Sequence, residues 1–239
     1  NQDQAWVYVT ENQTNWMGDL GSATTGVPFN RFVLPAAHDS GMYDPTTVNL
    51  IAGNYGLRSL LAACMVVIPG VGAMLGAGFE ALPASQVARE LINFAFTQKD
   101  DVTTLLNIGI RYFDFRPAYG YSLIGSDYPG LYHQHSFVPG VSYATFLQDM
   151  LTWLNQHPTE IVVLNLNFAQ LFSDSQKPTA ADLKTAMHDA QQATNTQHIQ
   201  LGSKNDLGTA YDVLIQANRR LLLMNQLGFS QYEATKYDS

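Results

Sequence analysis

Charged residues are scarce in this chain of 239 residues, and basic residues are scarcer than acidic ones. Only 13% of the residues are charged, with 12 Lys and Arg against 20 Asp and Glu, which gives a net charge of −8. No long basic run occurs, so electrostatics give no support for a nucleic-acid partner or for a polybasic attraction to anionic lipid. A neutral or zwitterionic membrane surface remains compatible with this charge balance.

Cysteine is almost absent as well. Cys64 is the only cysteine, which excludes an intrachain disulfide and any zinc site built on cysteine. The chain starts Asn-Gln-Asp-Gln, with neither an initiator Met nor a signal-like apolar segment, as is typical of a mature form that has lost a leader. We therefore expect a secreted or extracellular protein, or one that is peripheral at a membrane.

Hydrophobic residues are abundant, at 46%, so a chain of this length can bury a full core. Helices are expected to begin near 83, 142 and 179, and a last helix is expected at 209–217. A polar arm is expected at 1–30 and a loop at 41–56. Strands are expected at 31–34, 110–116, 131–137, 161–166 and 221–224. Strands that alternate with helices indicate a parallel α/β architecture, in which reactive side chains gather at the carboxyl ends of the strands.

A long apolar stretch interrupts this pattern between Arg58 and Glu80, where no residue is charged. Its length would cross a bilayer, but Pro69-Gly70 and further glycines interrupt it. A buried helical hairpin, an interfacial lid that touches a membrane, and a transmembrane span are the three interpretations, in that order of preference. We place it in an apolar helical insertion at about 50–98 within a single domain that spans 1–239.

Ionisable side chains lie at several of the predicted strand ends. His38 and Asp39 follow the first strand, Arg116 ends the second, and His133 and His135 lie in the third. A neutral imidazole can take a proton from a hydroxyl near physiological pH, and a guanidinium fork suits a phosphate group. Two histidines and an arginine, with no cysteine nucleophile, predict phosphodiester cleavage by general acid and base.

The roles of single residues in this group stay open. Asp114 shares a strand face with Arg116, so the two could form an ion pair without chemistry. His133 and His135 also share a face, which leaves open which of them points at the reacting centre. A metal site at these two histidines would need further ligands that the sequence does not clearly supply.

Four motifs, in order, resemble the X-domain of phosphatidylinositol-specific phospholipase C. They are Leu-Pro-Ala-Ala-His-Asp-Ser-Gly at 34–41, Gly-Ile-Arg-Tyr-Phe-Asp-Phe-Arg-Pro at 109–117, Tyr-His-Gln-His at 132–135, and the segment 146–164. The resemblance covers roughly 29–167. It implies a distorted TIM-type (β/α) barrel that cleaves the glycerol-phosphate bond of phosphatidylinositol, giving diacylglycerol and a cyclic inositol phosphate.

The same resemblance implies a role for each matching residue. His38 corresponds to the general base, Arg116 to the phosphate-binding arginine of the bacterial, metal-independent branch, and His133 to the general acid. Asp39 assists that acid and Asp114 supports the site. His135 stays an alternative acid, because Gln134 follows His133 where the family commonly has Gly.

Arg116, Asn165 and Asn167 are the candidate substrate-binding residues. The calcium-dependent branch of the family has a carboxylate where Arg116 stands and another near Asn167, so we expect no cofactor and disfavour calcium. The expected partner is a phospholipid substrate at a membrane surface, and neither a nucleic acid nor a protein partner is inferred.

The carboxyl-terminal part departs from the family. About five strands are expected up to Met224, where a closed barrel needs roughly eight, and no late strand supplies the carboxylate that partners the base histidine. The barrel is then incomplete at its C-terminal end, completed unusually, or part of a longer chain. A catalytically silent lipid- or phosphate-binding protein, or a related barrel phosphodiesterase for another head group, are the alternative functions.

Overall fold

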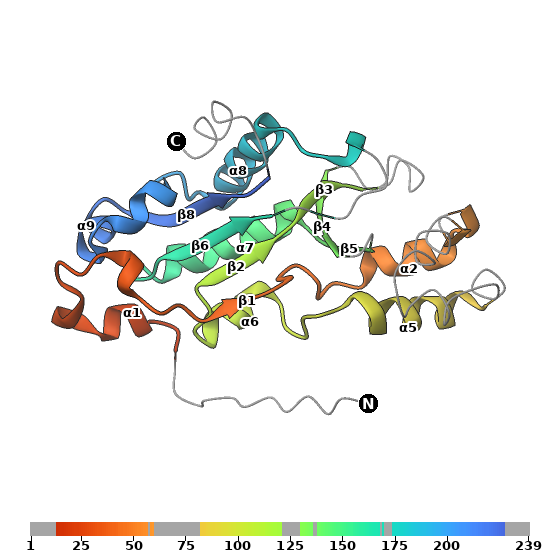
Figure 1. The fold of residues 1–239 in the computed structure, drawn as a ribbon, viewed down its shortest axis with the longest axis horizontal. Helices are drawn as coiled ribbons and strands as arrows, with labels where there is room; N and C mark the ends of the chain where they lie inside the picture. Colours follow the sequence, from red (N-terminus) through yellow and green to blue (C-terminus); the bar gives the residue numbers. More distant parts are fainter. Residues whose placement is uncertain are drawn as a thin grey trace.

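The computed structural model describes residues 13–56, 58–59, 82–120, 130–135, 138–167, 169 and 174–227. A parallel sheet of five strands forms its centre, in the order β1-β2-β6-β8-β7 (Figure 1). The strands are β1 (Ala36–Ala37), β2 (Tyr112–Phe115), β6 (Val162–Leu166), β7 (Gln200–Ser203) and β8 (Arg219–Asn225). The predicted parallel α/β architecture is confirmed.

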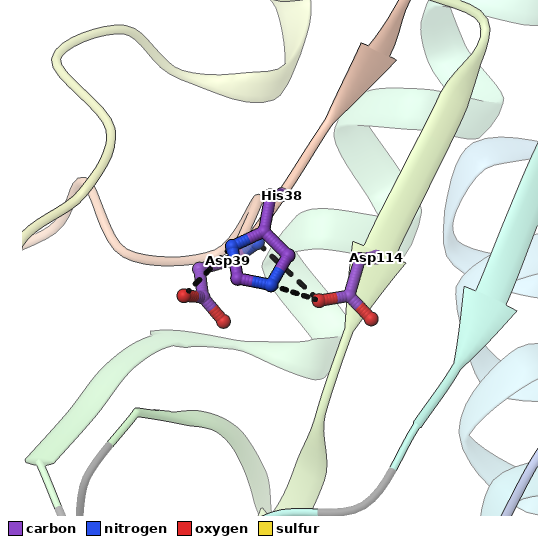
Figure 2. A group of neighbouring side chains, drawn as sticks. All are labelled: His38, Asp39 and Asp114. Atoms are coloured by element: carbon purple, nitrogen blue, oxygen red, sulfur yellow. Dashed lines mark hydrogen bonds and ion pairs between the residues drawn. The ribbon is translucent and has the colours of Figure 1, made fainter.

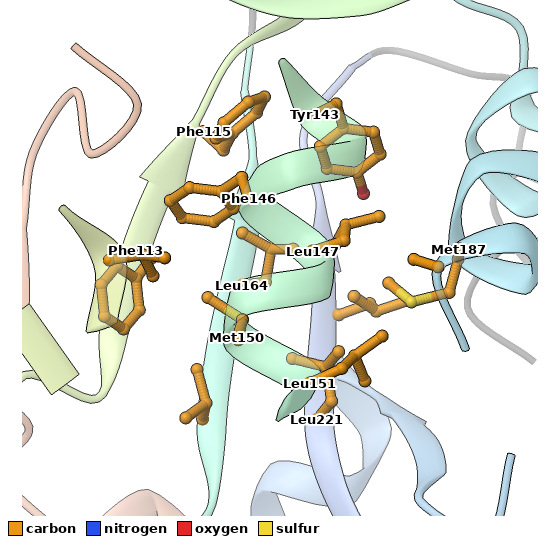
Figure 3. Close-up of a cluster of buried hydrophobic side chains, with 14 of the residues drawn as sticks. Phe113, Phe115, Tyr143, Phe146, Leu147, Met150, Leu151, Leu164, Met187 and Leu221 are labelled. Carbon is orange, nitrogen blue, oxygen red and sulfur yellow. The ribbon is translucent and has the colours of Figure 1, made fainter. Parts of the chain in front are cut away.

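Helices cover one face of this sheet. The main ones are α6 (Val102–Asn107), α7 (Tyr143–Gln156) and α8 (Ala180–Thr194). Figure 3 shows α7 with Phe146, Leu147 and Met150 directed at the sheet, where they meet Phe113 and Leu164. Because both faces of β6 are covered, all five of its residues are buried, as its continuous apolar run predicts.

The amino-terminal arm and a late helix cover the opposite face. The arm contains α1 (Trp16–Asp19) and the 3-10 turns η1 (Gly21–Thr24) and η2 (Phe29–Arg31), and the late helix is α9 (Tyr211–Gln216). Met17 and Phe29 from the arm and Tyr211 from α9 pack with Val163 and Leu222. The predicted arm is thus confirmed for residues 13–30.

A smaller antiparallel sheet lies beside the carboxyl end of β2. Its strands are β3 (Pro117–Tyr119), β4 (Leu131–His135) and β5 (Val138–Ser142), in that order. Next to it, the helices α2 (Thr46–Gly53) and α5 (Ala84–Ala95) run side by side and form a separate core (Figure 1). The expected strand at 131–137 therefore exists, but it pairs antiparallel outside the central sheet.

Three local predictions were wrong. The segment 31–34 is not a strand: η2 ends at Arg31, Val33 is 92% exposed, and β1 comprises Ala36–Ala37 only. The expected loop at 41–56 contains α2, whose residues Val48, Ile51 and Ala52 are buried at helical spacing. Strand β7 was missed, because Gln200-Leu-Gly-Ser203 has none of the β-branched residues that usually mark a strand.

The described sheet does not close into a barrel. Within residues 13–227, where they are described, β1 and β7 each pair with one neighbour and form the two edges. Strand β8 lies between β6 and β7, so the strands do not follow chain order around a cylinder. The fold is therefore the expected α/β type with the sheet open at both edges. Two further 3-10 turns, η5 (Asp174–Gln176) and η6 (Lys204–Gly208), complete it.

Most of the apolar stretch at 58–80 lies outside the described residues. Among the helices that the structure describes, none is long and apolar enough to span a bilayer. Helices α2 and α5 flank the stretch, so most of the described residues of the expected insertion at 50–98 are helical.

Candidate active site

A tight turn after β1 presents the first two site residues. Asp39 has a φ of 49°, the left-handed conformation that Asp tolerates better than most side chains. The next residue fixes the turn to β2, since the Ser40 hydroxyl donates to the Asp114 carbonyl at 2.7 Å. Gly41 is required here, because a Cβ would lie 2.5 Å from the Cβ of His133.

The guanidinium of Arg116 joins the residues of this turn to β2. Its Nη1 lies 2.8 Å from Asp39 Oδ1, and its Nη2 lies 3.1 Å from Asp114 Oδ2. The same Nη2 lies 2.8 Å from His38 Nε2. Asp114 and Arg116 therefore share a strand face, as predicted, and Arg116 is paired with two carboxylates and one imidazole.

Two carboxylates flank the imidazole of His38 (Figure 2). Asp39 Oδ2 lies 3.2 Å from Nδ1, and Asp114 Oδ2 lies 3.7 Å from Nε2. Since Arg116 donates to Nε2, the neutral ring carries its hydrogen on Nδ1, next to Asp39. The side chain of His38 is 74% exposed and hence open to a ligand. Asp39, which the family resemblance assigned to the acid, thus lies next to the imidazole of His38 as well.

His133 and His135 approach the same carboxylate from β4. His133 Nε2 lies 3.7 Å from Asp39 Oδ1, and its side chain is fully buried. His135 Nε2 lies 3.5 Å from Asp39 Oδ2, and its side chain is 21% exposed. The structure thus brings together all six predicted catalytic residues, although the two histidines come from the antiparallel sheet rather than from a parallel strand.

Burial and neighbouring charge act in opposite directions on this cluster. Burial would raise the pKa of Asp39, but the nearby imidazole of His133 and the charges of His135 and Arg116 outweigh it and hold that pKa below its ordinary value. For His133, burial dominates and lowers the pKa, and the nearby Asp39 offsets it only in part. The site therefore favours an ionised Asp39 beside a neutral His133.

The two predicted substrate-binding asparagines differ in position. Asn165 lies in register with Asp114 on the neighbouring strand β6, is 4% exposed, and its Oδ1 has no hydrogen-bond partner. Asn167 follows β6, is partly exposed, and its backbone N–H donates to the Phe115 carbonyl at 2.9 Å. Asn165 thus offers a free acceptor next to the cluster around Asp39.

The segment around α5 contacts His38 and His135, which the sequence did not reveal. The Gln98 side chain donates to the His38 carbonyl, and the Ala95 carbonyl lies 2.9 Å from His135 Nδ1. The ring of Phe94 stacks on that of His135 at 6.5 Å. A backbone carbonyl carries no sequence signal, so the sequence could not reveal this contact.

His38, Asp39 and Asp114 also satisfy the distances of a metal site, since one ligand atom from each lies within 4.8 Å of the others. Arg116, however, is paired with both carboxylates. A divalent cation at this point would meet the fixed charge of the guanidinium, so the donor set suits a cationic side chain better than a metal.

Known proteins of two kinds are similar to this chain. No family model matches the chain. The human PI-PLC X domain-containing protein 1 is 28% identical over 178 residues, which are 73% of this chain and 48% of the human protein. The mouse protein of the same name is 27% identical over 158 residues, which are 64% of this chain and 39% of that protein. The chain spans about half the length, or less, of these relatives.

Solved structures of the phosphatidylinositol-specific phospholipase C from Staphylococcus aureus have the same fold. One covers 94% of this chain and 56% of its own, with a TM-score of 0.52 and 17% identity, and a mutant of that enzyme gives a TM-score of 0.53. The chain is similar to the PI-PLC X domain-containing proteins. This confirms the family resemblance of the sequence motifs, and the S. aureus structures support a TIM-type α/β fold whose described sheet is open here.

Proposed function

We propose that this chain is a phosphodiesterase that cleaves the glycerol-phosphate bond of phosphatidylinositol and releases diacylglycerol and a cyclic inositol phosphate. The observation that carries the proposal is the 2.8 Å contact between Arg116 Nη2 and His38 Nε2. It places the cation suited to a phosphate beside the nitrogen suited to deprotonate a hydroxyl.

The reaction follows from these positions. A phosphoryl oxygen that binds Arg116 competes for the Nη2 hydrogen and frees His38 Nε2, which then takes the proton of the inositol hydroxyl next to the phosphate. That oxygen forms a bond to phosphorus, the bond from phosphorus to the glycerol oxygen breaks, and His133 or His135 protonates the leaving oxygen. Asp39 accepts the Nδ1 hydrogen of His38 and stabilises the imidazolium that forms.

The proposal assigns the chain to one phospholipase C-like domain with an insertion at 50–98, working without a metal at the surface of a phospholipid membrane. Arg116 supplies the positive charge that a metal would otherwise bring to the phosphate. Asn165 Oδ1, buried and unpaired beside Asp114, is an acceptor for a hydroxyl of the head group.

Release of cyclic inositol phosphate from phosphatidylinositol vesicles tests the proposal. His38→Ala and Arg116→Ala should each lower turnover by about 10²-fold or more. A chelator should leave turnover unchanged. His188, exposed on α8, supplies a matched control in His188→Gln. Full activity of His38→Ala would exclude the assigned base, and loss of activity in chelator would show that a metal takes part.

A catalytically silent lipid- or phosphate-binding protein is the second candidate. The open five-stranded sheet of the described residues favours it. Vesicle binding without turnover, unchanged by His38→Ala but lost in Arg116→Ala, would support this function instead.

A further inference from the structure

The two histidines of β4 meet neighbours of opposite hydrogen-bonding character. Both are near Asp39 through Nε2, so the difference lies at Nδ1. A ring nitrogen that faces an N–H must act as an acceptor, whereas one that faces a carbonyl must carry a hydrogen. The neighbours of Nδ1 therefore determine which of the two rings can hold two hydrogens.

His133 is built to remain neutral. Its Nδ1 accepts the backbone N–H of Arg116 at 3.2 Å, so a hydrogen on Nδ1 would face another N–H. The single N–H hydrogen of the neutral His133 ring therefore lies on Nε2, which faces Asp39. The ring is fully buried and packs edge-on against Phe115 at 4.8 Å, and both nitrogens face protein groups. A neutral imidazole without access to substrate has no proton to give to a leaving group.

His135 is built to carry two hydrogens. Its Nδ1 lies 2.9 Å from the Ala95 carbonyl, and its Nε2 faces the carboxylate of Asp39. Both neighbours accept hydrogen bonds and neither donates. Ala95 is also the last residue of α5, a helix of 12 residues. The carbonyls at a helix C-terminus carry partial negative charge and favour a cation, as does the ionised Asp39.

We infer that His135 is the general acid of the proposed reaction and that His133, which accepts the backbone N–H of Arg116 beside Asp39, is a positioning residue. This rests on the proposed function, and it reverses the assignment that the family resemblance implies. The separation of 3.5 Å between His135 Nε2 and Asp39 Oδ2 is longer than a formed hydrogen bond, so the Nε2 hydrogen is not bound to Asp39 and is available to a leaving oxygen. The 21% exposure of the side chain gives that oxygen access.

The assignment gives Asp39 a double role. It stabilises the imidazolium that forms at His38 and orients the imidazolium that is consumed at His135. In the step itself, the bond from phosphorus to the glycerol oxygen breaks while His135 gives its Nε2 hydrogen to that oxygen. His135 is then a neutral ring with its remaining hydrogen on Nδ1. That hydrogen stays bound to the Ala95 carbonyl, so helix α5 fixes the tautomer of the spent acid.

The dependence on the leaving group tests this assignment. Two substrates are compared: phosphatidylinositol, whose alkoxide must be protonated to leave, and an inositol 4-nitrophenyl phosphate diester, whose phenolate leaves without an acid. His135→Gln should lose about 10²-fold or more on the first and less than about 10-fold on the second. His133→Asn, in which Oδ1 can still accept the Arg116 N–H, should lose the same factor on both. His188→Gln should match the wild type on both.

The outcomes separate the two claims. Equal losses of His135→Gln on both substrates, or a leaving-group-dependent loss in His133→Asn, overturn the assignment of His135 while the proposed function stands. Inactivity of the wild-type chain on both substrates overturns the proposed function itself. A second measurement needs no variant: the ¹⁵N chemical shifts of the rings should show two protonated nitrogens in His135 and a single Nε2 hydrogen in His133. The reverse pattern overturns the inference.

Discussion

The carboxylate of Asp39 is the point where a guanidinium and three imidazoles meet. Arg116 Nη1 is 2.8 Å away, and the nearest ring nitrogens of His38, His135 and His133 are 3.2, 3.5 and 3.7 Å away. The residue is buried and its backbone is left-handed. Its charge therefore organises the acid, the base and the phosphate-binding residue together.

Asp39→Asn tests this role with little change in shape, because Asn tolerates the left-handed conformation at least as well as Asp. We expect turnover to fall by about 10²-fold or more, since the neutral amide stabilises neither imidazolium. The free energy of unfolding should fall by about 1–3 kcal/mol, because Arg116 loses its ion pair with residue 39 and retains only the one with Asp114. Turnover assays and urea unfolding measure the two effects, and a fully active variant would contradict the central place of Asp39.

His133 should make the fold sensitive to acid. Burial lowers its pKa below the ordinary 6.5, so below that pH the unfolded chain binds a proton that the folded chain excludes. The free energy of unfolding should therefore fall as the pH drops from 6.5 toward the lower pKa of the folded state. Urea unfolding at several pH values measures this slope. In His133→Asn the slope should become shallower, and an unchanged slope would show that another group is responsible.

At the scale of elements, the turn after β1 depends on close packing against β5. The backbone N–H of Val141 donates to the Gly41 carbonyl at 2.9 Å, and a Cβ on Gly140 would collide with that same carbonyl. The positions of His38 and Asp39 therefore depend on the small sheet as well as on the central one.

Gly140→Ala should displace this turn and lower both the thermal midpoint and the turnover. Gly208→Ala is the matched control, because nothing lies within 4 Å of a Cβ at that position. Calorimetry and the turnover assay distinguish the two variants. If Gly140→Ala kept wild-type turnover, the turn would not need its contact with β5.

The elements predicted best from sequence were those with strong local signals. The helices α7 and α8 have side-chain caps at Ser142 and Thr179, and β6 is a nearly continuous apolar run, interrupted only by Asn165. The pairing of Asp114 with Arg116 followed from the strand period alone. By contrast, the two-residue strand β1 exists only through its pairing with β2, and no local pattern could reveal it.

Within the site, the sequence indicated which residues come together but not which hydrogen-bond neighbours each of them has. The antiparallel pairing of β4 and the Ala95 carbonyl at the end of α5 depend on tertiary packing, and they determine the hydrogen-bond neighbours of His135. The choice between His133 and His135 therefore could not be made from residue spacing.

At the scale of the molecule, a buried ion pair attaches the amino-terminal arm to the sheet. Arg111 Nη2 lies 2.8 Å from Glu160 Oε2, and both side chains are fully buried. The same guanidinium donates to the carbonyls of Gln13 and Thr14, and Glu160 accepts the Gly18 N–H. The arm is thereby held to β2 and to the start of β6.

Glu160→Gln should lower the free energy of unfolding by about 3–5 kcal/mol, because it leaves a buried guanidinium without a counter-charge. Glu90→Gln, which removes a partly exposed partner of Arg89, should change it by about 0–1 kcal/mol. Urea unfolding of both variants tests the difference. Similar values for the two would show that the buried pair does not hold the arm.

The central proposal is that the cluster around Asp39 converts a phosphodiester of phosphatidylinositol into a cyclic phosphodiester. ³¹P NMR of phosphatidylinositol vesicles mixed with the chain follows that conversion directly. We predict that the resonance of the lipid phosphodiester is replaced by that of a cyclic inositol phosphate, with chelator present, and that His38→Ala slows this by about 10²-fold or more. An unchanged lipid resonance in the presence of vesicle-bound protein would contradict the account.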